Sequence, residues 1–566
     1  MRQFGEDHGY ASLLIAALLG TVLSLLSTGY LFATGNNLFH LGIIGALYDL
    51  PQYQNDAFIQ SLRHYASGPW LILSGKDRTL TVDGLFFVLL FFSRFLSILG
   101  FLLCAALLGL VSWRERLVFA SVIATCSIMR GLSLAGGGGL FIPEFTQSEI
   151  ANGLTLIMLY CLGRRNLLGG IILNALVFFT NAFFAVWNAL PFLLVTGYWL
   201  RTGAVSPRQA MRQIALASLP AMVIAAPILV NIRSNPHCGQ PMAVDYLTFL
   251  TQYWPLHFLI WSNSLGAIFG LAVIVILGAW GLCLLRPVNP TITLSSLAFV
   301  LVYGLGILVP MATHNPAILN LHLLRSSTCL HIMTSLILAS LLTRWVLSGD
   351  RLERRVLGPL LLLAFCSIRA LVPLAGIPLA IAMSPRLQRV ARHGIERRGI
   401  HAKWLAVAVG VLMLGLWSLY GRQQIATLRL SHQQVRTWTA IGEWARSQTP
   451  RDAVFLLPTK DIRPHAPAPY SYAGDSAIFE FTSHRQVWVD FIRGAAVMWT
   501  PSYYSEWNSR IWPVLALKTP GQRMDYARRK GITYLVEACT GGSAAFGVDG
   551  LCVYATKVPG KPPPSL

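Results

Sequence analysis

Two carboxylates near the start of the chain could act as a general base. Asp49 and Asp56 lie seven residues apart in a polar stretch that follows a long apolar run. A carboxylate at the edge of a membrane is partly desolvated, which raises its pKa and makes it a stronger base for a hydroxyl group. The pair could also hold a divalent metal, although two carboxylates alone do not specify one. Each has a structural alternative, because Asp49 precedes the turn-forming Pro51 and Asp56 could cap a helix that begins at Ala57.

A single arginine enters a later apolar run. Arg325 follows His322 by three residues in the segment Leu-His-Leu-Leu-Arg. A cation that enters lipid needs a partner, and a guanidinium group can bind two oxygens of one phosphate at once. On a helix, His322 would lie on the same face as Arg325. The two residues therefore indicate a phosphate-binding site, and the alternative is an ion pair with an acidic residue of another span.

Two further carboxylates follow a run of four glycines. Glu144 and Glu149 come shortly after residues 136–139 and could contact a substrate near the membrane surface. The alternative for Glu149 is that it stabilises the positive end of the next helix. The glycines are not followed by the Lys-Ser/Thr pair of a phosphate-binding loop, so we interpret them as a hinge.

Membrane-spanning helices must position most of these residues. Of the 566 residues, 54% are hydrophobic and 12% are charged, about half the ~25% of charged residues in a soluble domain. This composition excludes an ordinary cytosolic enzyme, a disordered scaffold and a small disulfide-rich domain. We expect a polytopic α-helical membrane protein with eleven to thirteen spans, near residues 10–34, 84–111, 117–136, 150–162, 167–181, 183–199, 213–232, 264–285, 292–312, 328–346, 357–370, 372–385 and 404–420.

The formal net charge of +21 is interpreted as a topology signal rather than as a sign of nucleic-acid binding. Arginine gathers in loops that fall on one side of the predicted membrane, and the positive-inside rule makes that side cytoplasmic. The last of these clusters, around residues 386–403, could also contact anionic lipid. The outer side then holds residues 36–83, 137–149, 233–262 and 313–327, together with everything after about residue 420.

The chain is expected to divide into a multi-span domain, residues 1–420, and a small mixed α/β domain on the outer side, residues 421–566. Within the second domain, apolar residues recur every three positions from Val435 to Trp444, and Pro450 should end that helix. Cys539 and Cys552 could form a disulfide on the oxidising side, and the alternative is two buried free thiols. Strand-length apolar runs lie at residues 453–457, 477–481, 487–491, 532–536 and 551–554.

This organisation resembles the polytopic membrane glycosyltransferases of the GT-C superfamily, in particular the bacterial members. The resemblance rests on an amino-terminal span, a long outer loop with Asp49 and Asp56, the late Leu-His-Leu-Leu-Arg segment and a terminal α/β domain. Residues 443–458, 483–491 and 506–510 are similar to the terminal domains of such bacterial proteins.

The resemblance implies an integral protein of the bacterial inner membrane that transfers a sugar from a polyprenyl-phosphate-linked donor to an envelope glycan, lipid or protein. It implies that Asp49 or Asp56 is the catalytic base and that Arg325 binds the lipid phosphate. No cofactor is specified. Two other functions remain open, namely a transporter or flippase of lipid-linked sugars and a non-catalytic partner in envelope polysaccharide assembly. Four aromatic residues could stack on sugar rings or belong to the core: Tyr503, Tyr504, Trp507 and Trp512.

Overall fold

A computed structural model describes residues 6–75, 81–285, 289–348, 352–397, 402–461, 463 and 476–556. Its internal contacts divide the chain into two compact units. The helical unit comprises Met1–Tyr30, Gly84–Pro227 and Trp254–Ala426, and the mixed unit comprises Leu31–Asp83, Ile228–Tyr253 and Thr427–Leu566. The last boundary lies close to the expected division at residue 420. The first outer loop, however, packs with the carboxy-terminal residues rather than with the spans, because its apolar side chains are buried in the mixed unit.

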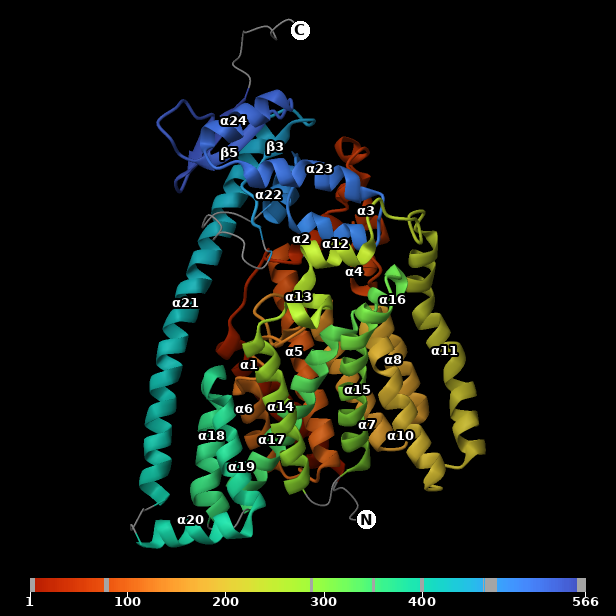
Figure 1. The fold of residues 1–566 in the computed structure, drawn as a ribbon, viewed down its shortest axis with the longest axis vertical. Coiled ribbons are helices and arrows are strands. Elements are labelled where there is room, and N and C mark those ends of the chain that lie inside the picture. The colour runs from red at the N-terminus through yellow and green to blue at the C-terminus, as the bar shows by residue number, and fades with distance from the viewer. Residues whose placement is uncertain are drawn as a thin grey trace, which may run out of the picture. The chain divides into compact units, whose positions relative to one another are not determined.

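The helical unit contains most of the long helices, and α11 and α21 continue from it into the mixed unit (Figure 1). Its later part also contains three 3₁₀ helices, η4 (Ile260–Ser262), η5 (Leu323–Ser326) and η7 (Arg369–Ala375), and one π-helix, η6 (Glu353–Leu357). Its helices are α1 (Glu6–Thr28), α5 (Val82–Leu107), α6 (Trp113–Thr125), α7 (Gln147–Gly163), α8 (Leu167–Thr180), α9 (Ala182–Trp187), α10 (Ala189–Arg201), α11 (Pro207–Ser234), α13 (Pro255–Phe258), α14 (Leu265–Leu284), α15 (Pro290–Ala312), α16 (Pro316–Leu319), α17 (Ser327–Ser348), α18 (Gly358–Cys366), α19 (Gly376–Met383), α20 (Pro385–Arg397) and α21 (Ala402–Gln448).

Eight helices of the described residues are long and apolar enough to cross a membrane, or nine if one bent pair is counted as a span. This number is lower than the thirteen apolar segments found in the sequence. Several of those segments form helices that are too short to span alone, such as α6, α8 and α18. Apolar content alone therefore identifies the membrane-spanning region of the chain, but it does not show where each helix ends.

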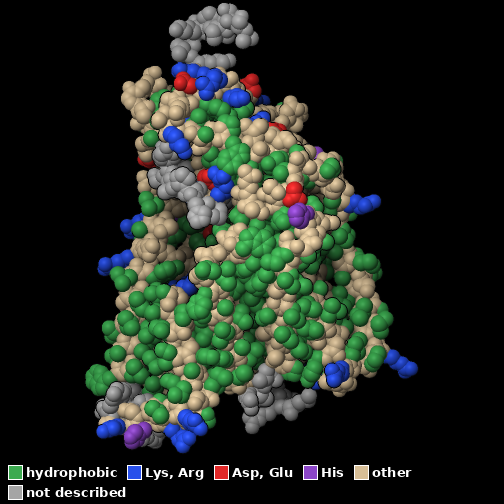
Figure 2. Space-filling view, viewed as in Figure 1, with side chains coloured by type: hydrophobic (Ala, Val, Ile, Leu, Met, Phe, Trp, Pro, Cys, Tyr) green, Lys and Arg blue, Asp and Glu red, His purple; other side chains and the backbone are tan. Residues whose placement is uncertain are grey.

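The surface of the helical unit agrees with a membrane location. Figure 2 shows a face covered by hydrophobic side chains, with basic side chains at the end where α20 lies. The start of α11 lies at this same end of the unit (Figure 1). Exposed apolar side chains along α14 and α15, such as Phe269 and Leu308, fit a lipid-facing surface.

The mixed unit contains a five-stranded sheet of order β4-β3-β5-β7-β6. The pairs β3·β4 and β3·β5 are parallel, and β5·β7 and β6·β7 are antiparallel. The strands are β3 (Val454–Leu456), β4 (Gln486–Val487), β5 (Tyr534–Ala538), β6 (Phe546–Val548) and β7 (Leu551–Ala555). The helices and helical turns of this unit are α2 (Asn37–Ile44), η1 (Leu47–Asp49), η2 (Pro51–Tyr53), α3 (Ala57–Ser61), η3 (Leu62–His64), α4 (Gly68–Leu73), α12 (Tyr246–Tyr253), α22 (Ser476–Ser483), η8 (Ile492–Met498), α23 (Tyr503–Ala516) and α24 (Pro520–Arg529).

Most of the elements expected in this unit are confirmed. Helix α21 ends at Gln448, just before Pro450, and buries Trp438 and Ile441. Strands β3, β5 and β7 lie close to the predicted runs, and Cys539 and Cys552 form a disulfide with a Cα–Cα distance of 4.9 Å. The strand predicted at residues 477–481 is wrong, because this segment is helix α22. A short apolar run has no periodicity that separates a strand from a buried helix.

Candidate functional site

The helical unit contains a small pocket at the turn that precedes α17. This turn holds Arg325 and His322, the two residues that the sequence singles out as a phosphate site. Both line the pocket, so the structure brings these predicted residues together. The complete lining is Gly138, Gly139, Ser148, Asn181, Phe183, Phe184, Trp187, His322, Arg325 and Thr328.

Arg325 lies on η5, one turn before α17 begins. Its backbone N–H donates a hydrogen bond to the carbonyl of His322 at 2.9 Å, which closes the tight turn that presents the side chain. The guanidinium group also acts on a second histidine. Burial lowers the pKa of His257 to about 4, and the positive charge of Arg325 contributes to this shift. His257 is therefore neutral at physiological pH, and the pocket region gains no extra cation from it.

His322 is held in a strained conformation. Its backbone φ is +50°, a left-handed value that costs free energy for a residue with a side chain. The imidazole lies between the rings of Phe183 and Phe258, each with a centroid 4.5 Å away. Only 7% of the residue is exposed, and its Nδ1 has no hydrogen-bond partner among the described residues. A buried, unsatisfied nitrogen in the wall of a pocket is suited to a hydrogen bond with a ligand.

The glycine run forms another side of this pocket. The glycine run, residues 136–139, ends the connection between β1 (Gly131–Leu132) and β2 (Gly139–Leu140), which form a short antiparallel hairpin, and its last glycine begins β2. A side chain at Gly138 would overlap the hydroxyl group of Thr328, and one at Gly136, where φ is +129°, would lie 2.8 Å from the Ser327 hydroxyl. The sequence predicts a hinge here. The structure instead gives the glycines a packing role, because their lack of side chains lets the hairpin lie directly against the start of α17.

Polar groups complete the lining. The Asn181 side-chain amide donates a hydrogen bond to the Ser148 hydroxyl at 3.0 Å, and its oxygen accepts one from the backbone N–H of Phe183 at 3.2 Å. Ser148 and Thr328 lie in the first turns of the long helices α7 and α17. Helix N-termini carry a partial positive charge. With Arg325 present and with no carboxylate among the described lining residues, the pocket fits an anionic group such as phosphate.

Glu149 and Glu144 do not line this pocket. Glu149 is fully buried in α7 and forms an ion pair with Arg94 of α5, with 3.2 Å between Oε2 and Nε. Arg94 also donates a hydrogen bond to the Ile142 carbonyl at 2.6 Å, so the pair connects α5 to the loop before α7. Glu144 is half-buried in that loop, and burial raises its pKa. A role for either residue in substrate binding stays a prediction, and the geometry of Glu149 fits a structural role.

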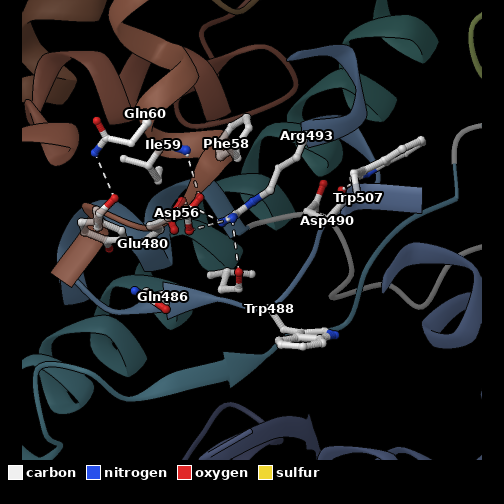
Figure 3. Close-up of polar contacts among 12 residues, drawn as sticks. Asp56, Phe58, Ile59, Gln60, Glu480, Gln486, Trp488, Asp490, Arg493 and Trp507 are labelled. Carbon is white, nitrogen blue, oxygen red and sulfur yellow. Dashed lines mark hydrogen bonds and ion pairs between the residues drawn. The ribbon is translucent and has the colours of Figure 1, made fainter. Parts of the chain in front are cut away.

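Asp56 belongs to a buried charge cluster in the mixed unit. Figure 3 shows Asp56, Arg493 and Glu480 pointing toward one another. Arg493 donates a hydrogen bond to Glu480 Oε2 at 2.8 Å, and its Nη1 lies 3.8 Å from Asp56 Oδ2. The other oxygen of Asp56 caps α3 by accepting a hydrogen bond from the Ile59 N–H at 3.0 Å. Asp56 is thus occupied by contacts that stabilise the fold, and only 12% of its side chain is exposed.

Asp49, in contrast, is accessible. It ends η1, and 58% of its side chain is exposed, so it is not the partly desolvated carboxylate that the sequence argument expects. One carboxylate oxygen forms an ion pair with Arg63 at 2.7 Å, and Arg63 also donates a hydrogen bond to the Tyr48 carbonyl at 2.8 Å. Of the two first-loop carboxylates, Asp49 is the one that could accept a proton from a substrate without disturbing a buried cluster.

Arg493 and Glu480 were not recognised from the sequence. No local pattern links them to Asp56, because they lie far along the chain in η8 and α22. The aromatic residues proposed for stacking divide between two environments: Tyr503 and Trp507 are buried, and Tyr504 and Trp512 are half-buried. Among the described residues, no group of three or more His, Cys, Asp or Glu side chains is placed to hold a metal ion.

The fold therefore defines a class, a polytopic helical membrane protein with a small mixed α/β region. Comparison with solved structures finds a similarity to the crystal structure of ArnT from Cupriavidus metallidurans in the apo state. The similarity covers 97% of this chain and 98% of that chain, at 13% identity and a TM-score of 0.43. Residues 436–514 match a family described as a domain of unknown function, DUF6798. Comparison with curated proteins finds no match.

Proposed function

We propose that this chain is a membrane-integral glycosyltransferase that takes its sugar from a polyprenyl-phosphate-linked donor. The observation that supports this proposal is the pocket around Arg325, which combines a guanidinium group, an unsatisfied histidine nitrogen and the first turns of two long helices. The phosphate of the donor would bind there. We further propose that the protein lies in a bacterial inner membrane and acts on an envelope glycan, lipid or protein on the outer face.

The chemistry follows from the charges of the reacting groups. A hydroxyl oxygen of the acceptor attacks the anomeric carbon of the sugar, and the bond from that carbon to the phosphate oxygen breaks. The leaving group is polyprenyl phosphate, which gains negative charge as it departs. Arg325 would stabilise this charge through two parallel N–H···O hydrogen bonds, and His322 would orient the phosphate. The acceptor proton must pass to a base, and Asp49 is the proposed base because its side chain is accessible.

The test is sugar transfer in membrane vesicles with a labelled polyprenyl-phosphate sugar. Arg325→Lys keeps the positive charge but loses the planar fork, so we expect transfer to fall by about tenfold or more. The matched control is Arg201→Lys, an exposed arginine at the end of α10 that should leave transfer unchanged. Equal transfer by both variants would contradict the phosphate role of Arg325. Binding of the donor without any transfer would instead indicate a transporter of lipid-linked sugars.

A further inference from the structure

Helix α20 lies apart from the pocket and has the features of a helix at a membrane surface. The helical segment Arg369–Met383 and the helix that follows it, Pro385–Gly394, meet at an angle of 101°. The chain therefore turns sharply after α19 and runs across the end of the helical unit (Figure 1). A direction nearly perpendicular to a preceding apolar segment is what a helix in the plane of a membrane requires.

The two faces of α20 differ strongly in chemistry. With about 100° of rotation per residue, Arg386, Arg389 and Arg392 share one arc of the helix. Leu387 and Val390 share a separate arc that holds no arginine of this group. All three arginines are exposed, and Figure 2 shows basic side chains at this end of the unit. The sequence of α20 contains several arginines and a single acidic residue, so the helix carries a net positive charge.

The apolar face of α20 is not covered by the described part of the protein. Leu387 is 45% exposed and Val390 is 70% exposed. Trp404, at the start of α21, is 71% exposed on the same segment of the chain. Exposed aliphatic side chains beside exposed arginines are unfavourable in water. They are favourable at a bilayer surface, where aliphatic and Trp side chains enter the acyl boundary and arginines reach the headgroups.

We propose that α20 lies in the membrane interface and binds the headgroups of anionic glycerophospholipids. Charge complementarity selects this ligand, since the arginine face meets phosphate groups while Leu387 and Val390 insert beside the acyl chains. The contact would anchor the junction between α19 and α21 on the basic side of the helical unit. This proposal does not depend on sugar transfer, because none of its residues lines the Arg325 pocket.

The experiment measures the association of spin-labelled phosphatidylglycerol with the purified full-length protein in phosphatidylcholine vesicles. The double variant Arg386→Gln/Arg389→Gln should lower the association constant by about fivefold or more, because each arginine near a surface contributes to anionic lipid binding. The control Arg208→Gln/Arg212→Gln removes the same charge from exposed positions at the start of α11, at the same end of the unit. The association constant of this control should change by less than about twofold.

Three results would overturn the proposal. The first is an equal loss of the association constant in both double variants, which would indicate diffuse charge attraction. The second is an unchanged association constant in the α20 variant. The third is equal association of the wild type with phosphatidylglycerol and phosphatidylcholine. Unfolding temperatures in pure phosphatidylcholine should agree among all three proteins, which confirms that the variants fold. If the double variant fails to fold, Val390→Ser provides a second test. It leaves the charge of α20 unchanged but removes an apolar side chain, so it should weaken the association of both phosphatidylglycerol and phosphatidylcholine with α20.

Discussion

At the scale of single residues, the two first-loop carboxylates differ in what surrounds them. Asp49 makes one exposed ion pair, which is worth about 0.2–1 kcal/mol. The substitution Asp49→Asn should therefore leave the unfolding temperature almost unchanged and, if Asp49 is the base, abolish sugar transfer. Asp56→Asn keeps the helix cap but removes a charge beside Arg493, so we expect a loss of about 1–3 kcal/mol of stability.

Thermal unfolding and sugar transfer, measured on the same two variants, separate these roles. Asp56→Ala also loses the cap of α3, and should be less stable than Asp56→Asn by about 1 kcal/mol. Retained transfer in Asp49→Asn would remove Asp49 from the mechanism. An Asp56→Asn variant as stable as the wild type would show that its contact with Arg493 contributes little to the fold.

Glu480 gives the mixed unit a specific dependence on pH. Burial raises its pKa to about 7, whereas an unfolded glutamate has a pKa of about 4.3. Between these values the folded state binds more protons than the unfolded state, so the contribution of Glu480 to stability falls as pH rises and becomes constant above about 7. The substitution Glu480→Gln replaces the carboxyl group with an amide that does not titrate. The unfolding temperature of the wild type minus that of the variant should therefore decrease from pH 5 to pH 7, and a constant difference would contradict the raised pKa.

At the scale of elements, the sequence indicates which residues belong to the candidate site, but it does not indicate which residues from distant segments contact them. The spacing of His322 and Arg325 predicts a shared helical face, which is wrong, because His322 has a left-handed backbone and precedes η5. The two residues nevertheless line one pocket, and its role as a phosphate site stays a prediction. The close approach of residues 136–139 to the start of α17 could not be predicted, because it depends on two segments that are far apart in the sequence. The same limit applies to Asp56. The sequence predicts, as one alternative, that Asp56 caps a helix, but it does not predict the contacts with Arg493 in η8 and Glu480 in α22.

The packing of the glycine hairpin is directly testable. Gly138→Ala should force the hairpin away from Thr328, lower stability by about 1–3 kcal/mol and weaken donor binding, since the two residues share the pocket wall. A second substitution, Thr328→Ala, should restore most of the stability by removing the clashing hydroxyl. The control is Gly304→Ala in α15, where no atom lies within 4 Å of the added Cβ. Equal effects of the two glycine variants would exclude the packing role.

At the scale of the whole molecule, sugar transfer on the outer face requires each loop to lie on its expected side of the membrane. Cys238 is exposed in a loop that we expect on the outer side. A membrane-impermeant maleimide should therefore label it in intact spheroplasts, and Cys238→Ser should lose that label. A cysteine introduced by Arg114→Cys, at an exposed position in the first turn of α6, should react only after the membrane is opened. The reverse pattern would invert the topology and place the terminal residues in the cytoplasm.

Arg325 is proposed to receive the phosphate of a lipid-linked sugar. A density map of the protein in lipid nanodiscs, recorded with a polyprenyl-phosphate sugar at saturating concentration, tests it most directly. We predict phosphate density within hydrogen-bonding distance of the Arg325 guanidinium group and next to His322, with the prenyl chain leaving toward the lipid. Phosphate density elsewhere in the protein, with the pocket around Arg325 unchanged, would contradict the proposed function.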